Sequence, residues 1–495
     1  MSAAPQLTRI VATVGPSCES EDAIVRLVES GASVFRLNFS HGDLAAHERR
    51  LAAVRAAGAR LGLPLAVLGD LQGPKIRVGA VAEPGIVLDA GAEVVFRRGD
   101  FEASADGPPF ALASTYASLV DDVKVGQRVL VDDGSIRMLA IAATDDELRC
   151  TVVTGGRVSS GKGINLPDTA LRTGPLSTRD LECVSWSVEH DLDFLALSFV
   201  RTAEEVRSLR TRIERAAKEA GHGDMRLPIV AKIERPEAVA AIESIVQEAD
   251  AIMVARGDLG VEMDLAKVPV VQRRLVETAH KWGRPCIVAT QMLQSMIDAP
   301  TPTRAEVSDV ATAIFASTDA VMLSGETAVG KYPALAVETM RRVAQETESY
   351  IAEQPPVDRA PTGLATTGYR TAALAHGVAI AAHDFRARFL VVWSQSGGGA
   401  RYLSQNDLRI PIVAVSSDER AVRQMQLLRA VVPVRMPVPA TLARFTEMID
   451  AYLLDTGWAA AGDRCVVVAG SPLGTTQTTN ALALHEVGNP QTGFR

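Results

Sequence analysis

Short apolar runs alternate with segments of helical apolar spacing over residues 9–70 and again over residues 177–350. A short apolar run is typical of a buried strand, and a period near 3.6 is typical of an amphipathic helix. The pattern predicts eight strands, which are Arg9–Val14, Ser33–Leu37, Pro64–Leu68, Phe194–Leu197, Ile229–Ala231, Ala251–Val254, Cys286–Ala289 and Ala320–Leu323. A helix is predicted after each of them, over Glu21–Glu29, Leu44–Arg60, Ser177–Glu189, Ala203–Ala220, Pro236–Val246, Pro269–Trp282, Ala305–Phe315 and Pro333–Tyr350.

Eight such units are the number that closes a (β/α)8 TIM barrel, in which a ring of parallel strands lies inside a ring of helices. The rhythm breaks after the third strand, where short alternating runs are separated by turn residues such as Asp133-Gly134, a strong hairpin signal. We therefore predict an α/β fold with a catalytic barrel formed by residues 1–73 and 175–350. Residues 74–174 are predicted to form an inserted, β-barrel-like lid domain.

A second alternating region follows a polar, proline-containing linker, Glu353–Pro361. It predicts an α/β domain over residues 351–495, with helices Thr371–Ala382 and Glu419–Leu428 and strands Phe389–Trp393, Ile412–Val415 and Cys465–Ala469. The Ser394–Gly399 loop (SQSGGG) runs from a strand into a helix, so its backbone N–H groups are placed to bind a phosphate. A plain glycine-rich connector is an equally good interpretation, and a second Gly/Thr-rich loop, Gly470–Asn480, favours binding slightly.

Polar and charged residues occur at the carboxyl ends of seven predicted barrel strands. They are Arg36, Asn38, Ser40, Asp70, Ser198, Lys232, Glu234, Gly257, Asp258, Thr290, Ser324 and Glu326. In a barrel these ends meet at one mouth, where the active sites of such barrels lie. A surface ion pair and an ordinary turn would explain a single strand end, but not the recurrence along the chain. We therefore interpret the set as an active site.

Three of these residues suggest a metal site. Lys232 and Glu234 are two residues apart on one strand, so their side chains point the same way, and Asp258 follows the next strand. Two carboxylates offer the oxygen ligands that Mg²⁺ or Mn²⁺ prefers, and the lysine adds a cation beside them. This combination predicts a site for a phosphate or an enolate.

Composition excludes other classes of protein. The chain of 495 residues is long enough for several domains, and its net charge of −8, without a block of Lys and Arg, argues against a nucleic-acid partner. Its five cysteines are scattered without a C-x-x-C pair, which indicates a reduced, cytoplasmic setting. We find no signal peptide, and no apolar run reaches the roughly 18 residues of a membrane span.

Eight stretches resemble, in order, the signature stretches of the pyruvate kinase family. They are RIVATVGPS, FRLNFSHG, GDLQGPKIRVG, GKGINLP, VAKIERPEA, ARGDLGVE, VATQMLQSM and LSGETAVGKYP. The resemblance covers the whole chain and implies a barrel, an inserted lid, a C-terminal regulatory domain and a homotetramer. It also implies phosphoryl transfer from phosphoenolpyruvate to ADP, which yields pyruvate and ATP in the last step of glycolysis.

The resemblance implies roles for the matching residues. Glu234 and Asp258 match the Mg²⁺ ligands, and Lys232 matches the cation that stabilises the phosphoryl group in transfer. Arg36 is expected to contact the same phosphoryl group. Such a reaction is catalysed mainly by positioning and charge neutralisation, which suits a lysine beside a metal.

The remaining positions concern the substrate carboxylate and the nucleotide. Gly257 and Asp258 are expected to offer backbone N–H groups to the carboxylate of the substrate. Thr290 is expected to bind that carboxylate and to line the face on which the enolate is protonated. The proton route stays open between Thr290, Ser324 and water. The positions that match nucleotide-binding residues are Arg77, Lys162 and His41.

One departure concerns potassium. Many family members hold K⁺ at positions that match Asn38, Ser40, Asp70 and the carbonyl of Leu71. This chain has Leu71 and Lys75 where K⁺-requiring members typically have Thr and Glu. An ammonium on Lys75 can fill or neutralise the pocket beside Asp70, so we expect activity that does not require K⁺. The alternative is a Lys75 turned to solvent, with K⁺ still bound.

The effector and two other functions stay open. Ser394, Gln395, Ser396, Gly397, Gly398 and Gly399 match the phosphate loop of the family's allosteric domain, which suits a sugar phosphate or AMP. A Mg²⁺-dependent aldolase or lyase on a similar barrel would not need Arg77 and Lys162. A catalytically silent metabolite sensor would not need intact Lys232, Glu234, Asp258 and Thr290.

Overall fold

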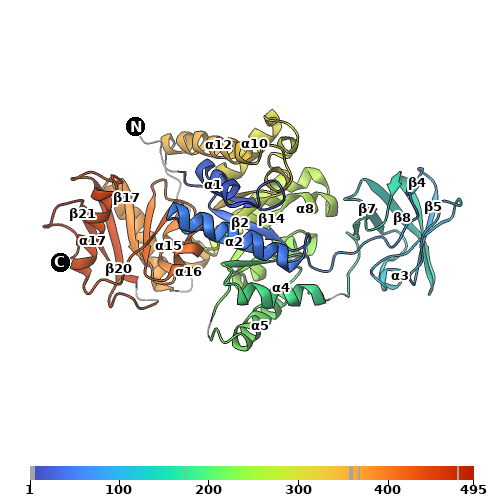
Figure 1. Ribbon diagram of the computed structural model, residues 1–495, viewed down its shortest axis with the longest axis horizontal. Coiled ribbons are helices and arrows are strands. Elements are labelled where there is room, and N and C mark those ends of the chain that lie inside the picture. Colours follow the sequence, from blue (N-terminus) through green and yellow to red (C-terminus); the bar gives the residue numbers. More distant parts are fainter. Residues whose placement is uncertain are drawn as a thin grey trace.

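The computed structural model describes residues 6–172, 174, 176–223, 225–355, 360–365, 368–476 and 479–495. Its three parts lie in a row, with the barrel between the inserted β domain and the C-terminal domain (Figure 1). Four expected features fall partly outside the described residues: the first residues of the barrel segment (1–5), the domain border at Pro175, the linker (356–359) and the second Gly/Thr-rich loop (477–478).

Eight parallel strands close into a barrel in the order β1-β16-β15-β14-β13-β12-β3-β2, which confirms the predicted fold class. They are β1 (Arg9–Thr13), β2 (Val34–Asn38), β3 (Ala66–Asp70), β12 (Phe194–Leu197), β13 (Ile229–Ile233), β14 (Ala251–Ala255), β15 (Cys286–Ala289) and β16 (Ala320–Leu323). The third strand lies two residues further along the chain than predicted, over Ala66–Asp70 and not Pro64–Leu68. Asp70 is therefore the last residue of the strand rather than part of the following loop.

Helices surround the strands, and several begin at a residue whose side chain caps the first turn; Ser177, for example, forms a capping box with Asp180. The long helices are α1 (Glu21–Ser30), α2 (Leu44–Leu61), α4 (Thr178–Glu189), α5 (Ala203–Glu219), α9 (Val268–Lys281), α10 (Arg304–Phe315) and α12 (Pro333–Glu353). The single helix predicted before β14 is in fact two, α6 (Pro236–Ala240) and α7 (Ile242–Glu248), because Ala241 leaves the helical conformation at φ −93° and ψ 11°. Two short helices, α8 (Arg256–Glu262) and α11 (Gly325–Ala328), follow β14 and β16.

The barrel has an inner and an outer apolar core. Alternate strand side chains such as Val11, Leu68 and Met253 fill the inside of the ring, while their neighbours pack outward against the helices. Leu427 of the C-terminal domain belongs to the inner cluster and is 1% exposed. The C-terminal domain thus contributes to the core of the barrel itself.

The inserted domain contains a six-stranded sheet in the order β11-β7-β8-β9-β5-β6 and a separate β10-β4 pair. Its elements are β4 (Ile86–Leu88), β5 (Glu93–Arg97), β6 (Phe110–Leu112), α3 (Leu119–Asp122), β7 (Arg128–Val131), β8 (Ile136–Ala143), β9 (Glu147–Thr154), β10 (Gly156–Val158) and β11 (Ile164–Asn165). The predicted hairpin joins β7 and β8 antiparallel. Its loop is longer than a two-residue turn, and Asp132, Asp133 and Gly134 all have positive φ.

The C-terminal domain has a five-stranded sheet in the order β19-β18-β17-β20-β21, in which only β21 is antiparallel to its neighbour. Its elements are α13 (Thr362–Ala365), α14 (Arg370–Asp384), β17 (Phe389–Trp393), α15 (Gly398–Ser404), β18 (Ile412–Ser416), α16 (Glu419–Gln424), β19 (Val431–Arg435), α17 (Leu442–Asp455), β20 (Arg464–Gly470) and β21 (Thr479–Glu486). We did not predict α17 or the two edge strands. The edge strand β19 contains Pro433, and a proline within an apolar run argues against a strand unless that strand lies at the edge of a sheet.

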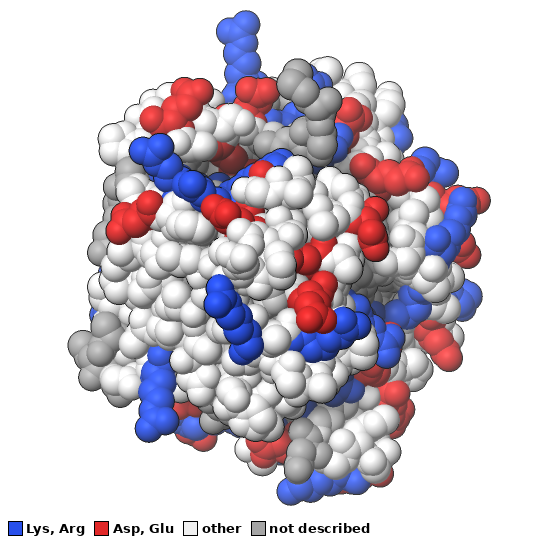
Figure 2. All heavy atoms as spheres, turned by 90° about the vertical axis from the view of Figure 1, so that its left-hand side faces the viewer, with Lys and Arg blue, Asp and Glu red and all other residues white. Residues whose placement is uncertain are grey.

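The outer face of this domain carries charged side chains of both signs around broad uncharged areas (Figure 2). Among the described residues, no helix is both long and apolar enough to cross a membrane.

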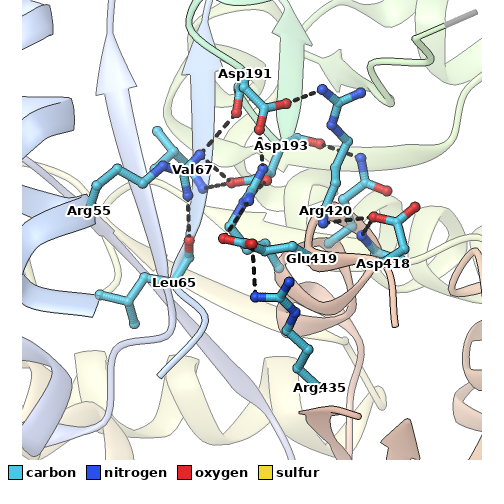
Figure 3. A network of polar contacts seen from close by, with 12 residues as sticks. Arg55, Leu65, Val67, Asp191, Asp193, Asp418, Glu419, Arg420 and Arg435 are labelled. Carbon is cyan, nitrogen blue, oxygen red and sulfur yellow. Dashed lines mark hydrogen bonds and ion pairs between the residues drawn. The ribbon is translucent and has the colours of Figure 1, made fainter. Parts of the chain in front are cut away.

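A network of ion pairs joins the C-terminal domain to the barrel (Figure 3). Arg423 donates to Asp193 Oδ1 and to Asp191 Oδ2, both at 2.6 Å, and Arg420 also pairs with Asp191. Asp193 has no exposed side-chain surface, and its Oδ2 accepts the Val67 N–H at 2.7 Å. Burial raises the pKa of Asp193 in spite of the arginines beside it. The cost of removing this carboxylate from water therefore offsets much of the attraction between the charges.

We expect Asp193→Ala to lower the free energy of unfolding by about 3 kcal/mol, because it removes the buried carboxylate that bonds both Arg423 and the Val67 N–H. Urea denaturation followed by circular dichroism measures this loss. The matched control is Asp298→Ala, which removes an exposed pair with Lys331 and should cost at most about 1 kcal/mol. Equal losses in the two variants would contradict the structural role of the network.

Candidate active site

A buried lysine lies at the centre of the barrel mouth. The Lys232 Nζ is 2.7 Å from the Ser198 Oγ, 2.9 Å from Glu234 Oε1 and 3.2 Å from Asp70 Oδ1. Burial alone would lower the pKa of Lys232, but the carboxylates of Asp70 and Glu234 outweigh it, so the pKa is raised. The structure therefore holds a permanent positive charge where three strands end.

Asp70 is shared between this lysine and Arg36. The Arg36 Nε donates to Asp70 Oδ2 at 2.6 Å, and its Nη1 donates to the Thr13 Oγ at 3.1 Å. Burial would raise the pKa of Asp70, but Lys232 and Arg36 bring it below its usual range. Thr13 ends β1, the one barrel strand at whose end no site residue was predicted. The polar Thr13 follows the apolar residues Ile10–Ala12, and this pattern could have identified it.

Glu234 and Asp258, the residues predicted to be metal ligands, lie beside the lysine. Glu234 Oε2 accepts the Phe199 N–H at 2.6 Å, and Asp258 lies in the first turn of α8. Burial, and then the charge of Glu234, raise the pKa of Asp258 to about 7. Two carboxylates that repel each other favour a cation between them.

Two carboxylates, Glu234 and Asp258, suit a magnesium ion better than they suit a metal whose ligands all come from the protein. Among the described residues, no group of three or more His, Cys, Asp or Glu side chains is arranged to hold a metal ion. Mg²⁺ commonly takes one or two protein carboxylates and completes its shell with water and substrate oxygens. Glu234 and Asp258 would supply that number of ligands to a bound ion.

Thr290 is held in an uncommon conformation, with φ +66°. Its hydroxyl accepts the Gly257 N–H at 2.7 Å, so this N–H bonds within the site. Arg256 keeps the loop in place: its guanidinium donates to the carbonyl of Thr290 at 2.9 Å and pairs with Asp309. The sequence analysis missed Arg256, although a charged residue directly after an apolar strand was a usable signal.

The predicted nucleotide-binding residues come from both sides of the mouth. Arg77 and Lys162 lie on neighbouring strand segments of the inserted domain, because Arg77 bridges to Gly163. Lys162 Nζ is 2.8 Å from Asp132 Oδ1, so this cation is occupied by a carboxylate of its own domain. Burial, and then the charges of Arg36 and Arg77, lower the pKa of His41, so His41 lies near these two arginines.

The inserted domain touches the barrel beside Asp258. A cleft between them is lined by Lys75, Asp133, Arg201, Arg235, Asp258 and Glu262, among others. Asn165 donates to Glu262 at 2.9 Å, and Arg235 donates to the carbonyl of Leu166 at 3.2 Å. Both domains thus line this cleft at one side of the mouth.

The residues expected to form a potassium pocket are engaged by protein groups. Asn38 Oδ1 accepts the Ser40 N–H at 3.2 Å, and the carbonyl of Leu71 accepts the Ser198 hydroxyl at 2.6 Å. Lys75 does not contact Asp70; its ammonium lies 3.8 Å from where a Cβ of residue 163 would stand. Lys75 is exposed and, within the described part of the chain, has no ion pair; its charge opposes the raised pKa of Asp258 and adds to the lowered pKa of His41.

Two further predicted residues differ in role. Glu326 accepts the backbone N–H groups of Leu293 at 3.1 Å and of Ser324 at 2.7 Å, so it organises the loop. The Ser324 hydroxyl is buried and has no hydrogen-bond partner among the described residues. A buried hydroxyl in that state is available to a substrate or a water at the mouth.

The Ser394–Gly399 loop lies far from this mouth. It lines a cavity of about 650 Å³ between the C-terminal domain and the barrel, together with Thr475 and Thr476 of the second Gly/Thr-rich loop. Gly397 has φ +79°. The Ser394 hydroxyl accepts the Ala400 N–H at 3.1 Å, which closes the loop on the helix that follows.

The (β/α)8 barrel, with a buried lysine and two carboxylates at the carboxyl ends of its strands, defines an enzyme that acts on an anionic substrate. The model described as "Pyruvate kinase, barrel domain" matches residues 6–337, and "Pyruvate kinase, alpha/beta domain" matches residues 372–485. The chain therefore belongs to the pyruvate kinase family and is a transferase of glycolysis. Membership in this family implies phosphoenolpyruvate and ADP as substrates.

Individual relatives agree with this. The chain is 39% identical over 480 residues to the pyruvate kinase of Mycobacterium intracellulare, covering 97% of this chain and 98% of the relative. It is 38% identical over 482 residues to the pyruvate kinase of Geobacillus stearothermophilus, covering 97% of this chain and 80% of that longer protein. A crystal structure of a pyruvate kinase from Cryptosporidium parvum superposes with a TM-score of 0.87 at 29% identity, covering 97% and 96% of the two chains.

We expect Asp258 to make the metal-free chain less stable as pH rises. Its pKa is raised from 3.8 to about 7 in the folded chain, so the folded state binds the extra proton between these values. That stabilisation is fully present below pH ~4 and is lost as pH rises through ~7. Calorimetry from pH 4 to 8 should show the midpoint of wild type falling relative to that of Asp258→Asn.

The surface variant Asp298→Asn is the control for this experiment and should follow wild type. Adding Mg²⁺ should stabilise wild type more at pH 8 than at pH 5, because the ion binds the deprotonated carboxylate. Parallel pH profiles for wild type and Asp258→Asn would contradict the raised pKa.

Proposed function

We propose that the barrel mouth catalyses Mg²⁺-dependent transfer of the phosphoryl group of phosphoenolpyruvate to ADP, with Lys232 as the central cation. The observation that supports this most directly is the buried Lys232 ammonium, held between Asp70, Glu234 and Ser198. Transferring phosphoryl groups carry charge on three oxygens, and fixed cations in a buried site stabilise that charge.

Each residue has a defined task in this proposal. Arg36 and Lys232 contact the phosphoryl group while its bond to the enolate oxygen breaks and its bond to the β-phosphate of ADP forms. Glu234 and Asp258 hold Mg²⁺, which when bound neutralises substrate oxygens. Gly257, Asp258 and Thr290 bind the substrate carboxylate, and Thr290 lines the face on which the enolate carbon takes up a proton.

The inserted domain serves the nucleotide in this proposal. Arg77, Lys162 and His41 bind the phosphates of ADP, and Lys162 exchanges Asp132 for the nucleotide when it does so. Closure of the domain over the mouth excludes water, which limits hydrolysis of the phosphoryl group.

We expect Lys232→Met to lower kcat roughly 10²- to 10³-fold in an assay of ATP formation from phosphoenolpyruvate, ADP and Mg²⁺. The substitution removes the cation and keeps most of the side-chain volume. The control is Lys331→Met on the surface, where the same change should leave kcat unaltered. Circular dichroism checks that both variants are folded.

The same assay separates the proposal from its alternatives. An aldolase or lyase would consume phosphoenolpyruvate or pyruvate without forming ATP. A silent sensor would bind a metabolite and turn nothing over. An active Lys232→Met variant would show that the lysine is not the central cation.

We propose further that catalysis does not require K⁺. What supports this is the positive charge of Lys75 near the mouth, together with Asp70 being already paired with Lys232 and Arg36. The ammonium of Lys75 acts through its charge and without contact to Asp70.

Replacing K⁺ by Na⁺ or tetramethylammonium should change the turnover of wild type less than about twofold, because fixed cations already compensate the pocket. Lys75→Glu should make turnover depend on K⁺. The control Lys124→Glu makes the same charge change at an exposed position of the inserted domain and should leave cation use unaltered. A large loss in wild type without K⁺ would contradict the proposal.

The C-terminal domain is proposed to regulate the enzyme by binding a phosphorylated effector, a sugar phosphate or AMP, at the Ser394–Gly399 loop. Support comes from the shared cavity of the two Gly-rich loops. We also propose a cytoplasmic homotetramer, which light scattering of the purified chain tests for assembly. No nucleic acid or membrane partner is proposed.

A further inference from the structure

The chain enters and leaves the inserted domain through two segments that lie side by side. The Val78 N–H donates to the carbonyl of Lys162 at 2.8 Å, and the Ile164 N–H donates to the carbonyl of Ile76 at 2.9 Å. The entering segment is therefore paired with the leaving one. Two adjacent crossings of this kind form a hinge, about which a domain can turn unless another contact fixes its angle.

A polar contact beside this hinge joins the inserted domain to the barrel. The Asn165 Nδ2 donates to Glu262 Oε1 at 2.9 Å, and the Arg235 Nη2 donates to the carbonyl of Leu166 at 3.2 Å. Asn165 and Leu166 belong to the inserted domain, whereas Arg235 and Glu262 belong to the barrel. The contact therefore crosses the border between the domains directly after the second crossing of the chain.

The barrel side of this contact is buried. Arg235 is 4% exposed and Glu262 is 2% exposed. Their closest charged atoms, Arg235 Nη2 and Glu262 Oε2, are 3.9 Å apart, and that oxygen has no hydrogen-bond partner among the described residues. A charged group that is removed from water depends strongly on each hydrogen bond that remains to it. The bond from Asn165 therefore favours a domain that stays in contact with Glu262.

The helix that carries Glu262 also carries a predicted metal ligand. Asp258 lies in the first turn of α8, and Glu262 is its last residue, four positions later. Residues four apart share one face of a helix. The loop between β7 and β8 lies on the same helix, because Val261 Cγ1 is 3.4 Å from where a Cβ of Gly134 would stand. Two segments of the inserted domain thus contact the helix that positions Asp258.

The strand that carries Asn165 is close to the predicted nucleotide-binding cations. Lys162 precedes Asn165 by three residues, and Gly163 between them pairs with Arg77. Asn165 itself pairs with Leu130 of β7, so this strand is part of the six-stranded sheet. A shift of Asn165 away from Glu262 would therefore move both cations relative to the metal ligands.

We propose that Asn165, Glu262 and Arg235 are positioning residues, which hold the inserted domain at the angle from which Arg77 and Lys162 meet the nucleotide. The proposal rests on the nucleotide role proposed above for these two cations. Without the contact the domain turns more freely about its hinge, so ADP has to order the domain when it binds. Water then also reaches the mouth more often during the reaction.

Asn165→Leu tests the contact, because it removes the amide and keeps a side chain of similar size. In the assay of ATP formation, the KM for ADP should rise about tenfold, as expected for the loss of a hydrogen bond to a charged group. The KM for phosphoenolpyruvate should change less than about twofold, because the barrel residues that bind it are untouched. The ratio of phosphate released to ATP formed should rise roughly threefold or more, because water competes with ADP.

Gln127→Leu is the matched control, because the Gln127 Nε2 donates at 2.6 Å to the carbonyl of Asp168, a bond within the inserted domain. It should leave both KM values and the ratio unaltered. Glu262→Gln keeps an oxygen that accepts from Asn165, so it should raise the KM for ADP less than about threefold. An unchanged or lowered KM for ADP in Asn165→Leu, or an equal rise in Gln127→Leu, would overturn the proposal.

A measurement without substrates separates this proposal from the proposed function. Hydrogen exchange of residues 76–78 and 162–164, followed by mass spectrometry, should be about tenfold faster in Asn165→Leu than in wild type or Gln127→Leu. If wild type forms no ATP, the proposed function fails, and faster exchange in Asn165→Leu alone still supports the contact. Equal exchange in wild type and Asn165→Leu would overturn the contact, whichever reaction the chain catalyses.

Discussion

The active site depends on one positive charge, the Lys232 ammonium, held where burial alone would favour its loss. Asp70 and Glu234 keep it protonated, and Ser198 fixes its direction. Asp70 ends β3, Ser198 follows β12 directly, and Glu234 follows β13, the strand that carries Lys232. The charge therefore exists only if the barrel is closed and its strands are in register.

The same constraint explains why so many neighbours are charged. Asp70 must be ionised to hold Lys232, and Arg36 helps by lowering its pKa further. Burial, and then the charge of Glu234, raise the pKa of Asp258 to about 7, so this carboxylate keeps a proton up to about that pH. In the metal-free chain, the negative charge of Asp70 is thus balanced by Lys232 and Arg36. The carboxylates of Glu234 and Asp258 lack an equal amount of positive charge beside them. A divalent cation fits the second side, and the anionic substrate fits the space between them.

Sequence reasoning worked where local pattern decides structure. Eight apolar runs with helices between them predicted the barrel, and the rule for its strand ends brought Lys232, Glu234 and Asp258 together correctly. It failed where tertiary contact decides. The helix between β13 and β14 is interrupted at Ala241, although no Gly or Pro marks that position. The edge strand β21 follows a polar loop and is stabilised by its pairing with β20, which the local sequence does not reveal. The position of Lys75 beside Gly163, rather than beside Asp70, also depends on a contact between residues that are far apart in the sequence.

The two ends of the barrel differ in how they use charge, and this difference bears on regulation. At the mouth, cations and carboxylates are arranged for a substrate. At the other end Leu427 enters the inner core, and Asp193 ties Arg423 to the barrel, so the C-terminal domain is part of the barrel's own packing. A change in how that domain sits has to pass through side chains that share the core with the strands. Those strands carry Lys232 and Asp70 at their far ends. In the regulation proposed above, an effector that alters the contact would therefore act on the site through packing alone, without touching it.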